Sequence, residues 1–415
     1  MIVGFCSFFY LLCLYHGAKL EQDPHNHLHH HFAPHGFISN STLAGADEGC
    51  KFYTKYETTN IVSFQMCVGQ SPQDLKNGMS IINLIQSRGY LPTCRVLHLM
   101  LWMQSEVVTS GNSKLSNRRD TFVDIGANIG SCTNHIASLG YPVISAEPVK
   151  EHVNTIIGTM ESNPSFHIDL HHIGISSESK TMNVSFGHGA RNWGASVFEE
   201  DKTPNAQATL DLKTVDQLVG HRRVSLMKID CEGCEWSALI GAKRTLKKTP
   251  MIKIELVQPK YIDGNTTATP EEVVKFLYEH GFELYKDHWL ENYLYFGKQG
   301  NDVLDIDRMF GNTKLKANLD IKFLEECAKK ILADPIDVDK FNGHAFQKSF
   351  TDVIAIDRNL ANKLKVRFMG ASPSIIAVDD ANGPNGSASD SSVIDDKKDH
   401  NGGIGSLFTG FKFGV

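Results

Sequence analysis

The sequence predicts an α/β fold with a mostly parallel sheet, and three patterns in the middle of the chain indicate it. Short apolar runs alternate with stretches of helical periodicity from about 121 to 280. One of these runs, 122–125, leads straight into a glycine turn that opens a helix. A helix predicted over 270–280 closes on Gly281, and glycine is favoured just after a helix end. Strands that alternate with helices form a parallel sheet whose two faces are both covered.

These patterns place the predicted elements in chain order. Strands are predicted over 121–125, 143–147, 167–173, 224–230, 251–257, 282–286, 293–297 and 352–357. Helices are predicted from the glycine turn to Gly140, from about 149 onward, over 235–247 and over 270–280. We therefore assign residues 120–359 to one domain with helices on both faces of its sheet.

Three further segments flank or interrupt this domain. Residues 50–119 are expected to form an N-terminal helical extension, with helices over 80–87 and 96–108. Residues 298–350 are expected to be an insertion with one amphipathic helix near 320–332. We assign 360–415 to a disordered C-terminal tail, because Gly, Ser, Asp and Asn dominate from about 371 onward.

Composition excludes one class of partner. Apolar residues make up 41% and charged residues 21% of the 415 residues, which is ordinary for a globular protein. The formal net charge is −6, and the longest basic cluster, in 243–248, fits a solvated helix face. Binding to a phosphate backbone needs strong basic patches. We therefore expect no nucleic-acid partner.

The chain begins with an almost unbroken apolar run, Ile2–Tyr15. A helix of that length covers about 21 Å, which is less than the roughly 30 Å hydrocarbon core of a membrane. The run fits the apolar part of a signal peptide over 1–18, which predicts the endoplasmic reticulum or Golgi lumen, or secretion. An uncleaved anchor, with membrane association through residues 2–15, stays open, and so does an incorrectly assigned start.

The next segment, 19–49, is a polar leader with six histidines between His25 and His35. Such a tract can bind a transition metal or can serve as a spacer, and it offers too few apolar residues for a packed core. In an oxidising compartment Cys50, Cys67 and Cys94 could supply a disulfide bridge ahead of the domain.

The strongest local signal is FVDIGANIG at 122–130. A buried strand runs into a glycine turn at the start of a helix, which is typical of a nucleotide-binding corner. Gly126 permits the tight turn and Gly130 permits close packing, where free N–H groups at the helix start attract an anionic group. Glu147 ends the next strand, 147 − 126 = 21 residues after Gly126, which is the spacing of a carboxylate that binds a ribose diol.

Two residues of this corner favour S-adenosylmethionine over a dinucleotide. The dinucleotide fingerprint needs glycine at the position of Asn128, so that the backbone can approach the pyrophosphate. A side chain there obstructs a diphosphate but can hydrogen-bond the carboxylate or amine of an amino-acid moiety. Asp124 places a negative charge where phosphates would be repelled and an ammonium would be attracted.

A second group of polar residues follows a later strand, in KIDCEGCEW at 228–236. Asp230 ends the strand at the carboxyl edge of the sheet, where open α/β sheets bind ligands. Glu232 and Glu235 follow in the loop and the first helical turn. Carboxylates this close together should not ionise independently, so at least one pKa should be shifted. For Glu235, a simple preference for the helix N-terminus is an equally good interpretation.

Together, FVDIGANIG, AEP at 146–148, KIDCEGCEW and IKIEL at 252–256 resemble the FkbM family of S-adenosylmethionine-dependent methyltransferases. The resemblance covers about 120–297 and resumes at 350–359. It implies a Rossmann-like, seven-stranded fold whose last strand is antiparallel, and O-methylation, often of sugars or natural products. Carried over by position, Asp124, Gly126, Asn128, Gly130 and Glu147 would be cofactor contacts, and Asp230 with Glu232 would line the active-site edge.

Two features depart from the family pattern. Cys231 and Cys234 replace small or aliphatic residues and create a C-x-x-C. A second C-x-x-C for a four-ligand zinc site is absent, so we expect no metal and favour two partly buried thiols, with a local disulfide as the alternative. His188 and Arg191, in a Gly-rich stretch at 187–196, could recognise the acceptor or belong to an ordinary loop.

The sequence thus predicts methyl transfer from S-adenosylmethionine to an oxygen or nitrogen of a small-molecule or glycan acceptor. A hydroxyl acceptor is helped by a general base, for which the candidates are Glu232, Asp230 and Glu235, in that order. A nicotinamide-dependent oxidoreductase and a secreted, non-catalytic module that retains the fold are the alternatives.

Overall fold

The computed structural model describes the parts of the chain that form the predicted domain and its extension. The described residues are 49–58, 62–70, 74, 79–108, 120–187, 197–200, 208–256, 268–287, 321–343 and 352–371. They belong to one compact unit, Met1–Pro373, and the second unit, Ser374–Val415, lies outside them. The predicted signal or anchor, the His-rich tract, the strand at 293–297, His188 and Arg191 also lie outside the described residues.

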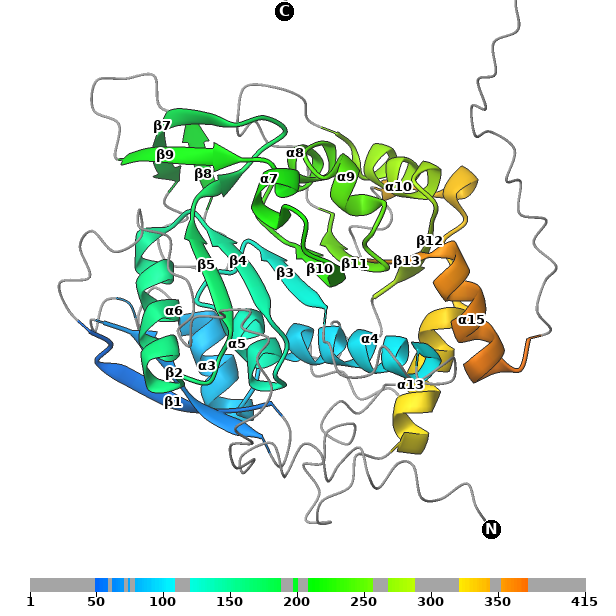
Figure 1. Ribbon diagram of the computed structural model, residues 1–415, viewed down its shortest axis with the longest axis horizontal. Coiled ribbons are helices and arrows are strands. Elements are labelled where there is room, and N and C mark those ends of the chain that lie inside the picture. Colours follow the sequence, from blue (N-terminus) through cyan, green and yellow to red (C-terminus); the bar gives the residue numbers. More distant parts are fainter. Residues whose placement is uncertain are drawn as a thin grey trace, which may run out of the picture. The chain divides into compact units, whose positions relative to one another are not determined.

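A seven-stranded sheet forms the centre of the fold (Figure 1). In spatial order its strands are β12 (Phe282–Lys286), β13 (Asp352–Asp357), β11 (Met251–Glu255), β10 (Val224–Ile229), β3 (Thr121–Ile125), β4 (Val143–Glu147) and β5 (Ile168–His172). Strands β11, β10, β3, β4 and β5 pair in parallel, and β13 is antiparallel to both of its neighbours. The predicted α/β fold and its antiparallel last strand are confirmed.

The central strands are buried along their whole length because both faces of the sheet are covered. Every residue of β3, β4 and β10 is buried. Side chains alternate between two core clusters: Phe122 belongs to one and Val123 to the other. The same alternation holds for Leu226 and Met227 on β10. This period-two division is what continuous apolar runs produce in a parallel sheet.

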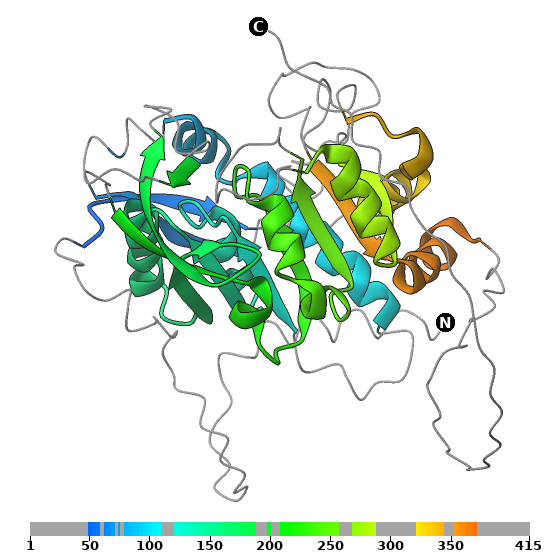
Figure 2. The same ribbon diagram turned by 90° about the horizontal axis from the view of Figure 1, so that it is seen from above.

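Each face of the sheet is covered by its own set of helices (Figures 1 and 2). One face packs against α4 (Pro92–Val108), α5 (Ser131–Ser138), α6 (Lys150–Ser162), α13 (Ile321–Ala333) and α15 (Arg358–Met369). The other packs against α7 (Val215–Val219), α8 (Glu235–Ile240), α9 (Lys243–Leu246) and α10 (Pro270–Glu279). No helix among the described residues is long and apolar enough to cross a membrane.

The helix predicted over 235–247 is divided into α8 and α9. Gly241 ends α8, and a Cβ added there would lie 2.5 Å from the carbonyl oxygen of Ser176. The chain after β5 therefore approaches the backbone of Gly241 closely, and the helix breaks at this contact.

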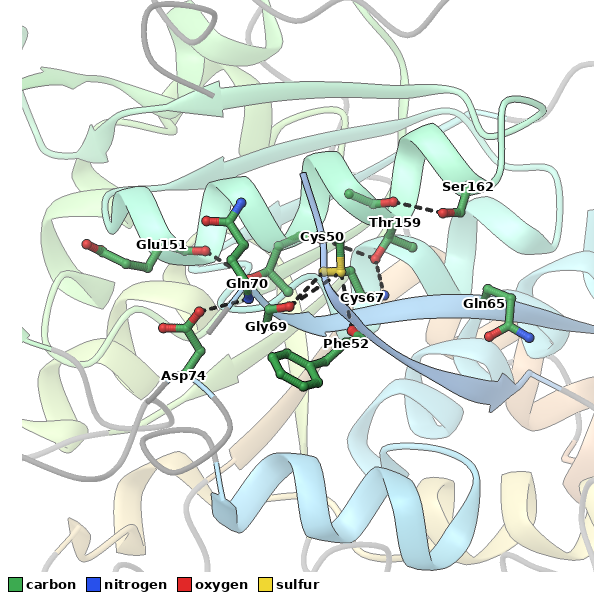
Figure 3. The surroundings of a disulfide bond; sticks show 12 residues. Cys50, Phe52, Gln65, Cys67, Gly69, Gln70, Asp74, Glu151, Thr159 and Ser162 are labelled. Atoms are coloured by element: carbon green, nitrogen blue, oxygen red, sulfur yellow. Dashed lines mark hydrogen bonds between the residues drawn. A yellow bond between two sulfur atoms is a disulfide. The ribbon is translucent and has the colours of Figure 1, made fainter. Parts of the chain in front are cut away.

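The N-terminal extension contains a β-hairpin as well as the two predicted helices, α3 (Met79–Arg88) and α4. Strands β1 (Phe52–Glu57) and β2 (Ser63–Gly69) pair antiparallel, and a disulfide joins Cys50 to Cys67 (Figure 3). The hairpin contacts α6, where Thr159 accepts a hydrogen bond from the Cys67 N–H at 2.9 Å. The description of this extension as only helical was incomplete.

A second disulfide fastens this extension to the domain. It joins Cys94 on α4 to Cys132 on α5, and both residues are buried. All three cysteines that could supply a bridge, Cys50, Cys67 and Cys94, are thus in disulfides. Cys132, within the domain, is the partner of Cys94.

A separate four-stranded sheet, which the sequence patterns missed, follows β5. Its spatial order is β6 (Gly174–Ile175), β9 (Ala208–Lys213), β7 (Lys180–Gly187) and β8 (Val197–Glu200). Figure 1 shows it beyond the carboxyl ends of the central strands. Along β9, exposed and buried residues alternate, as in a sheet with one solvated face.

The predicted C-terminal tail begins too early. Residues 358–369 form α15, and Asp357 caps it by accepting the N–H groups of Asn359 and Leu360 at 3.0 and 3.1 Å. Leu364 and Phe368 are buried in the same core as α4 and α13. The abundance of charged side chains on its other face hid this helix in the sequence. The amphipathic helix predicted near 320–332 is confirmed as α13.

Candidate active site

The glycine turn after β3 lies against the end of β10. Gly126 has a φ of 77°, and a Cβ added there would lie 1.9 Å from the carbonyl oxygen of Asp230. Gly130, with a φ of 79°, caps α5, and a Cβ there would come within 2.6 Å of the Ile156 side chain. Both positions therefore require glycine, as the sequence predicts, and both place the turn at the carboxyl edge of the sheet.

All five N–H groups of this turn are already used inside the protein. Those of Gly126 and Ala127 donate to the Ala146 carbonyl, and that of Gly130 donates to the Ala127 carbonyl. The Asn128 N–H donates to Glu147 Oε2 at 2.7 Å, and the Ile129 N–H donates to Asn128 Oδ1. None of the N–H groups of 126–130 is therefore free to attract an anion, and the expected free N–H groups at the helix start would have to be those of α5 itself, which begins at Ser131.

Glu147 connects the turn to the end of β4. Its Oε1 accepts the Val149 N–H at 2.9 Å and lies 3.1 Å from His152 Nδ1, while its Oε2 accepts the Asn128 N–H at 2.7 Å. A carboxylate oxygen can accept two hydrogen bonds, so Oε2 retains capacity for a hydroxyl donor. This acceptor oxygen fits the ribose diol that the sequence analysis predicts for Glu147.

Asp124 does not face a ligand. Its side chain is completely buried, accepts a hydrogen bond from Thr133 Oγ1 at 2.7 Å and pairs with Lys228 Nζ at 3.3 Å. The ammonium that this carboxylate attracts is therefore the one of Lys228, and not one of a cofactor. The prediction that Asp124 contacts the cofactor directly is therefore corrected: Asp124 lies beneath the glycine turn and pairs with Lys228 there.

Lys228, which the sequence patterns did not single out, joins the two halves of the site. Besides Asp124 it pairs with Asp230 at 3.2 Å and donates to the Gly126 carbonyl oxygen at 3.1 Å. Burial acts to lower the pKa of Lys228, but the two carboxylates outweigh it and raise the pKa above its ordinary value. Lys228 thus stays charged, and losing one partner of such a buried pair typically costs about 3–5 kcal/mol.

Three carboxyl groups meet at the neighbouring strand ends. Oxygen atoms of Asp230, Glu232 and Glu255 all lie within 4.8 Å of one another. Asp230 follows β10, Glu232 lies in the loop after it, and Glu255 ends β11. The structure thus brings together two of the three predicted bases. It adds Glu255, whose sequence signal was its position at the end of the IKIEL strand beside β10.

The surroundings of these carboxyl groups shift their pKa values in opposite directions. Burial acts to raise the pKa of Asp230, but Lys228 nearby holds it below its ordinary value. Burial, followed by the charges of Asp230 and Glu232, raises the pKa of Glu255 well above its ordinary value. Of this neighbouring pair, Glu255 is therefore the carboxyl that holds a proton more readily, and Asp230 is the one that ionises more readily. Carboxyl oxygens so placed can hold a proton or a hard cation.

Glu235 lies apart from these groups. It is buried, and its Oε1 accepts the N–H groups of Cys231 at 3.0 Å and Gly233 at 3.2 Å. Its carboxylate therefore faces the backbone of the loop. This geometry supports the interpretation of Glu235 as a residue that orders the start of α8, and it removes Glu235 from the candidate bases.

Cys231 and Cys234 form a disulfide across the loop that carries Glu232. The preferred expectation of two thiols is wrong, and the alternative of a local disulfide is correct. The residue between them, Glu232, has a φ of 58°, and Gly233 has a φ of 122°. Two consecutive positive φ angles turn the chain sharply enough to bring the two sulfur atoms together.

Titration of Glu235 should make the stability depend on pH. Burial raises its pKa from 4.5 to about 7, so the folded state favours the protonated form. The resulting stabilisation is complete below about pH 4.5 and is lost as the pH rises through 7. Glu235→Gln keeps the acceptor oxygen without the titration. Between pH 4.5 and 7.5, wild type should lose about 3 kcal/mol of unfolding free energy relative to this variant in urea denaturation.

The control for this measurement is Glu151→Gln, which changes an exposed glutamate at the start of α6. Its unfolding free energy should follow that of wild type at every pH. Parallel pH profiles for wild type and Glu235→Gln would contradict the assigned environment of Glu235.

Comparison with known proteins identifies the domain. Residues 124–284 match the methyltransferase FkbM domain. No curated protein matches the chain. Among solved structures, the precorrin-6y C5,15-methyltransferase from Geobacter metallireducens GS-15 is 13% identical, with 45% of this chain and 72% of that chain covered and a TM-score of 0.25.

Two further structures have similar values. The magnesium protoporphyrin IX methyltransferase from Synechocystis PCC 6803, solved with bound SAM, is 12% identical over 46% of this chain and 71% of that chain, with a TM-score of 0.25. The bifunctional kinase-methyltransferase WbdD is 14% identical over 43% of this chain, with a TM-score of 0.24, and the match spans 33% of its length. The domain match includes both the glycine turn and the acidic strand ends, and this chain carries a methyltransferase FkbM domain at residues 124–284.

Proposed function

We propose that this protein transfers the methyl group of S-adenosylmethionine to a hydroxyl oxygen of a sugar, glycan or small hydroxylated acceptor. One observation carries the proposal: Glu147 accepts a hydrogen bond from the glycine turn, and every N–H group of 126–130 already has an acceptor inside the protein. This turn lies within the region that matches the methyltransferase FkbM domain. A nucleoside that presents hydroxyl donors suits this corner. A diphosphate needs N–H donors that the turn no longer has.

The residues of the corner suggest how the cofactor is held. Glu147 Oε2 would accept a ribose hydroxyl, and Asn128, held beside it by the Ile129 N–H, would present its amide group to the amino-acid moiety. Gly126 and Gly130 shape the turn. When bound, S-adenosylmethionine supplies an activated methyl group on a positively charged sulfur, and the nearby carboxylates provide a negative environment for it.

Glu232 is the best-placed base for the acceptor. All three carboxyl residues are partly exposed, but the pKa of Glu255 is raised well above its ordinary value and Lys228 lowers the pKa of Asp230. A strongly stabilised carboxylate is a poor proton acceptor, so Asp230 would orient the acceptor hydroxyl by accepting its hydrogen bond. Positioning of the hydroxyl in line with the departing sulfur supplies the remainder of the catalysis.

The disulfides support a second proposal, that the protein acts in the secretory pathway or is secreted. Three disulfides join the described cysteines Cys50–Cys67, Cys94–Cys132 and Cys231–Cys234. Disulfides of this kind form in oxidising compartments. The apolar run at Ile2–Tyr15 agrees with entry into that pathway, through a cleaved signal or a membrane anchor.

Removal of the Glu147 carboxylate should weaken cofactor binding. Titration of the full chain with S-adenosylhomocysteine in a calorimeter should show binding for wild type and at least about tenfold weaker binding for Glu147→Ala, because a hydrogen bond to a charged group is worth about 1.5–3 kcal/mol. Glu151→Ala, at the exposed start of α6, should bind like wild type. Binding of NAD without S-adenosylhomocysteine would indicate an oxidoreductase, and binding of neither would indicate a non-catalytic module.

Loss of the Glu232 base should impair transfer but leave cofactor binding intact. With radiolabelled methyl donor and a fractionated extract or glycan library, Glu232→Gln should transfer about 10²–10⁴-fold more slowly, which is the usual contribution of a general base. Its affinity for S-adenosylhomocysteine should stay near that of wild type. Transfer by Glu232→Gln at the wild-type rate would exclude Glu232 as the base.

The compartment can be tested on the protein from its own cells. Mass spectrometry without reduction should find Cys94 bonded to Cys132, because this buried bridge is protected once formed. A cleaved signal would start the mature chain near residue 19, and an anchor would leave the chain intact in the membrane fraction. Thiols at Cys94 and Cys132 in a soluble, uncleaved chain would contradict the proposal.

A further inference from the structure

We propose that the Cys231–Cys234 disulfide is a thiol–disulfide exchange site for a dithiol reductant, and that its opening releases the loop that carries Glu232. Methyl transfer would then depend on the redox state of this pair. The exchange and the loop release stand on the geometry alone, and only the effect on transfer rests on the proposed function.

The two cysteines of the pair differ in exposure. Cys231 is partly exposed, whereas Cys234 is only 2% exposed and belongs to the core. The bridge between Cys94 and Cys132 offers no such access, since these residues are 0% and 4% exposed. A reductant can therefore reach Cys231 in the folded protein, while Cys94–Cys132 requires unfolding.

The pair closes a much shorter loop than the other two disulfides. Its cysteines are 3 residues apart, against 17 for Cys50–Cys67 and 38 for Cys94–Cys132. A disulfide stabilises a protein mainly by restricting the unfolded chain, and the restriction grows with the length of the closed loop. The pair therefore adds little to global stability, and its main effect is on the loop itself.

That loop is held in an unfavourable conformation. Glu232 has a φ of 58°, which a non-glycine residue adopts at a cost and keeps only where its surroundings hold it. The disulfide contributes to this, as does the Glu235 carboxylate, which accepts the N–H groups of Cys231 and Gly233. Opening of the disulfide removes one of these restraints, so Glu232 can return to a negative φ and move its carboxylate away from Asp230.

The cofactor side of the site is held independently of the disulfide. The Asp230 N–H donates to the Ile125 carbonyl oxygen at 3.1 Å, and Lys228 joins Asp230 to the Gly126 carbonyl. These contacts belong to the sheet and not to the loop. Reduction should therefore displace Glu232 while the glycine turn keeps its position.

The exchange is balanced by the dithiol alone. A thiolate of the reductant attacks Cys231 Sγ, the bond between the two cysteine sulfurs breaks, and Cys234 leaves as a thiolate that takes a proton. The second thiol of the reductant then attacks the mixed disulfide and releases Cys231. Two electrons and two protons pass to the pair, and the reductant ends as a disulfide. An oxidised dithiol reverses the reaction.

The first test is a redox titration of the folded full chain with dithiothreitol mixtures, followed by alkylation and mass spectrometry. Cys231 and Cys234 should become alkylated while Cys94 and Cys132 stay bonded. The ratio of reduced to oxidised dithiothreitol needed to open Cys94–Cys132 should be at least about ten times the ratio that opens Cys231–Cys234. Simultaneous reduction of both bridges, or reduction only on unfolding, would overturn the proposal.

The second test measures hydrogen exchange in the loop, which needs no methyltransferase activity. Reduction should speed exchange of the Cys231 and Gly233 amides about tenfold, while the amides of Gly126 and Ala127 stay protected. Cys231→Ser with Cys234→Ser should exchange like the reduced wild type with or without dithiothreitol. The matched control, Cys50→Ser with Cys67→Ser, should keep the redox response. Loop exchange that is unchanged by reduction would disprove the release.

The effect on function has its own readout. Reduced wild type and the Cys231→Ser, Cys234→Ser variant should bind S-adenosylhomocysteine within about threefold of oxidised wild type and transfer methyl at least about tenfold more slowly. Equal transfer rates in both redox states, with the loop released, would refute the redox dependence. If no cofactor binds to any form, the proposed function fails while the first two tests still decide the exchange.

Discussion

One buried lysine holds the site together. Lys228 lies between Asp124 under the glycine turn and Asp230 at the end of the next strand, and it also donates to the Gly126 carbonyl. A charge taken out of water is tolerated only where opposite charges and hydrogen bonds surround it. The ends of β3 and β10 are therefore locked at a fixed separation, and this separation defines the position of the cofactor corner relative to the acidic edge.

Around this lysine the carboxyl groups have different tasks because their surroundings differ. Asp124 is buried and compensates the lysine, whereas Asp230 lies at the edge with a lowered pKa, beside Glu255 with a raised pKa. The Glu235 carboxylate accepts hydrogen bonds from the loop backbone. Glu232 is partly exposed and lies on the segment that the Cys231–Cys234 disulfide closes. Residues close in sequence are thus separated in function by burial and by hydrogen bonding.

The N-terminal extension and the four-stranded sheet both adjoin the central domain. The hairpin is attached to α6, and Cys94–Cys132 attaches α4 to α5, the helix that the glycine turn opens. The four-stranded sheet follows β5 beyond the carboxyl ends of the central strands. The central domain is thereby attached to the extension on its N-terminal side through α5 and α6.

The sequence by itself determined the central sheet and the location of the site. Continuous apolar strands, Gly126 and Gly130 with their positive φ angles, and Glu147 at the next strand end are local patterns that backbone sterics and burial enforce directly. Only the tertiary structure decided that Lys228 pairs with Asp124, that Glu255 joins Asp230, and that Cys231 and Cys234 are bonded. These contacts depend on which strands become neighbours and how loops turn, and a charged residue or a cysteine has the same appearance in the sequence whether its partner is solvent or another side chain.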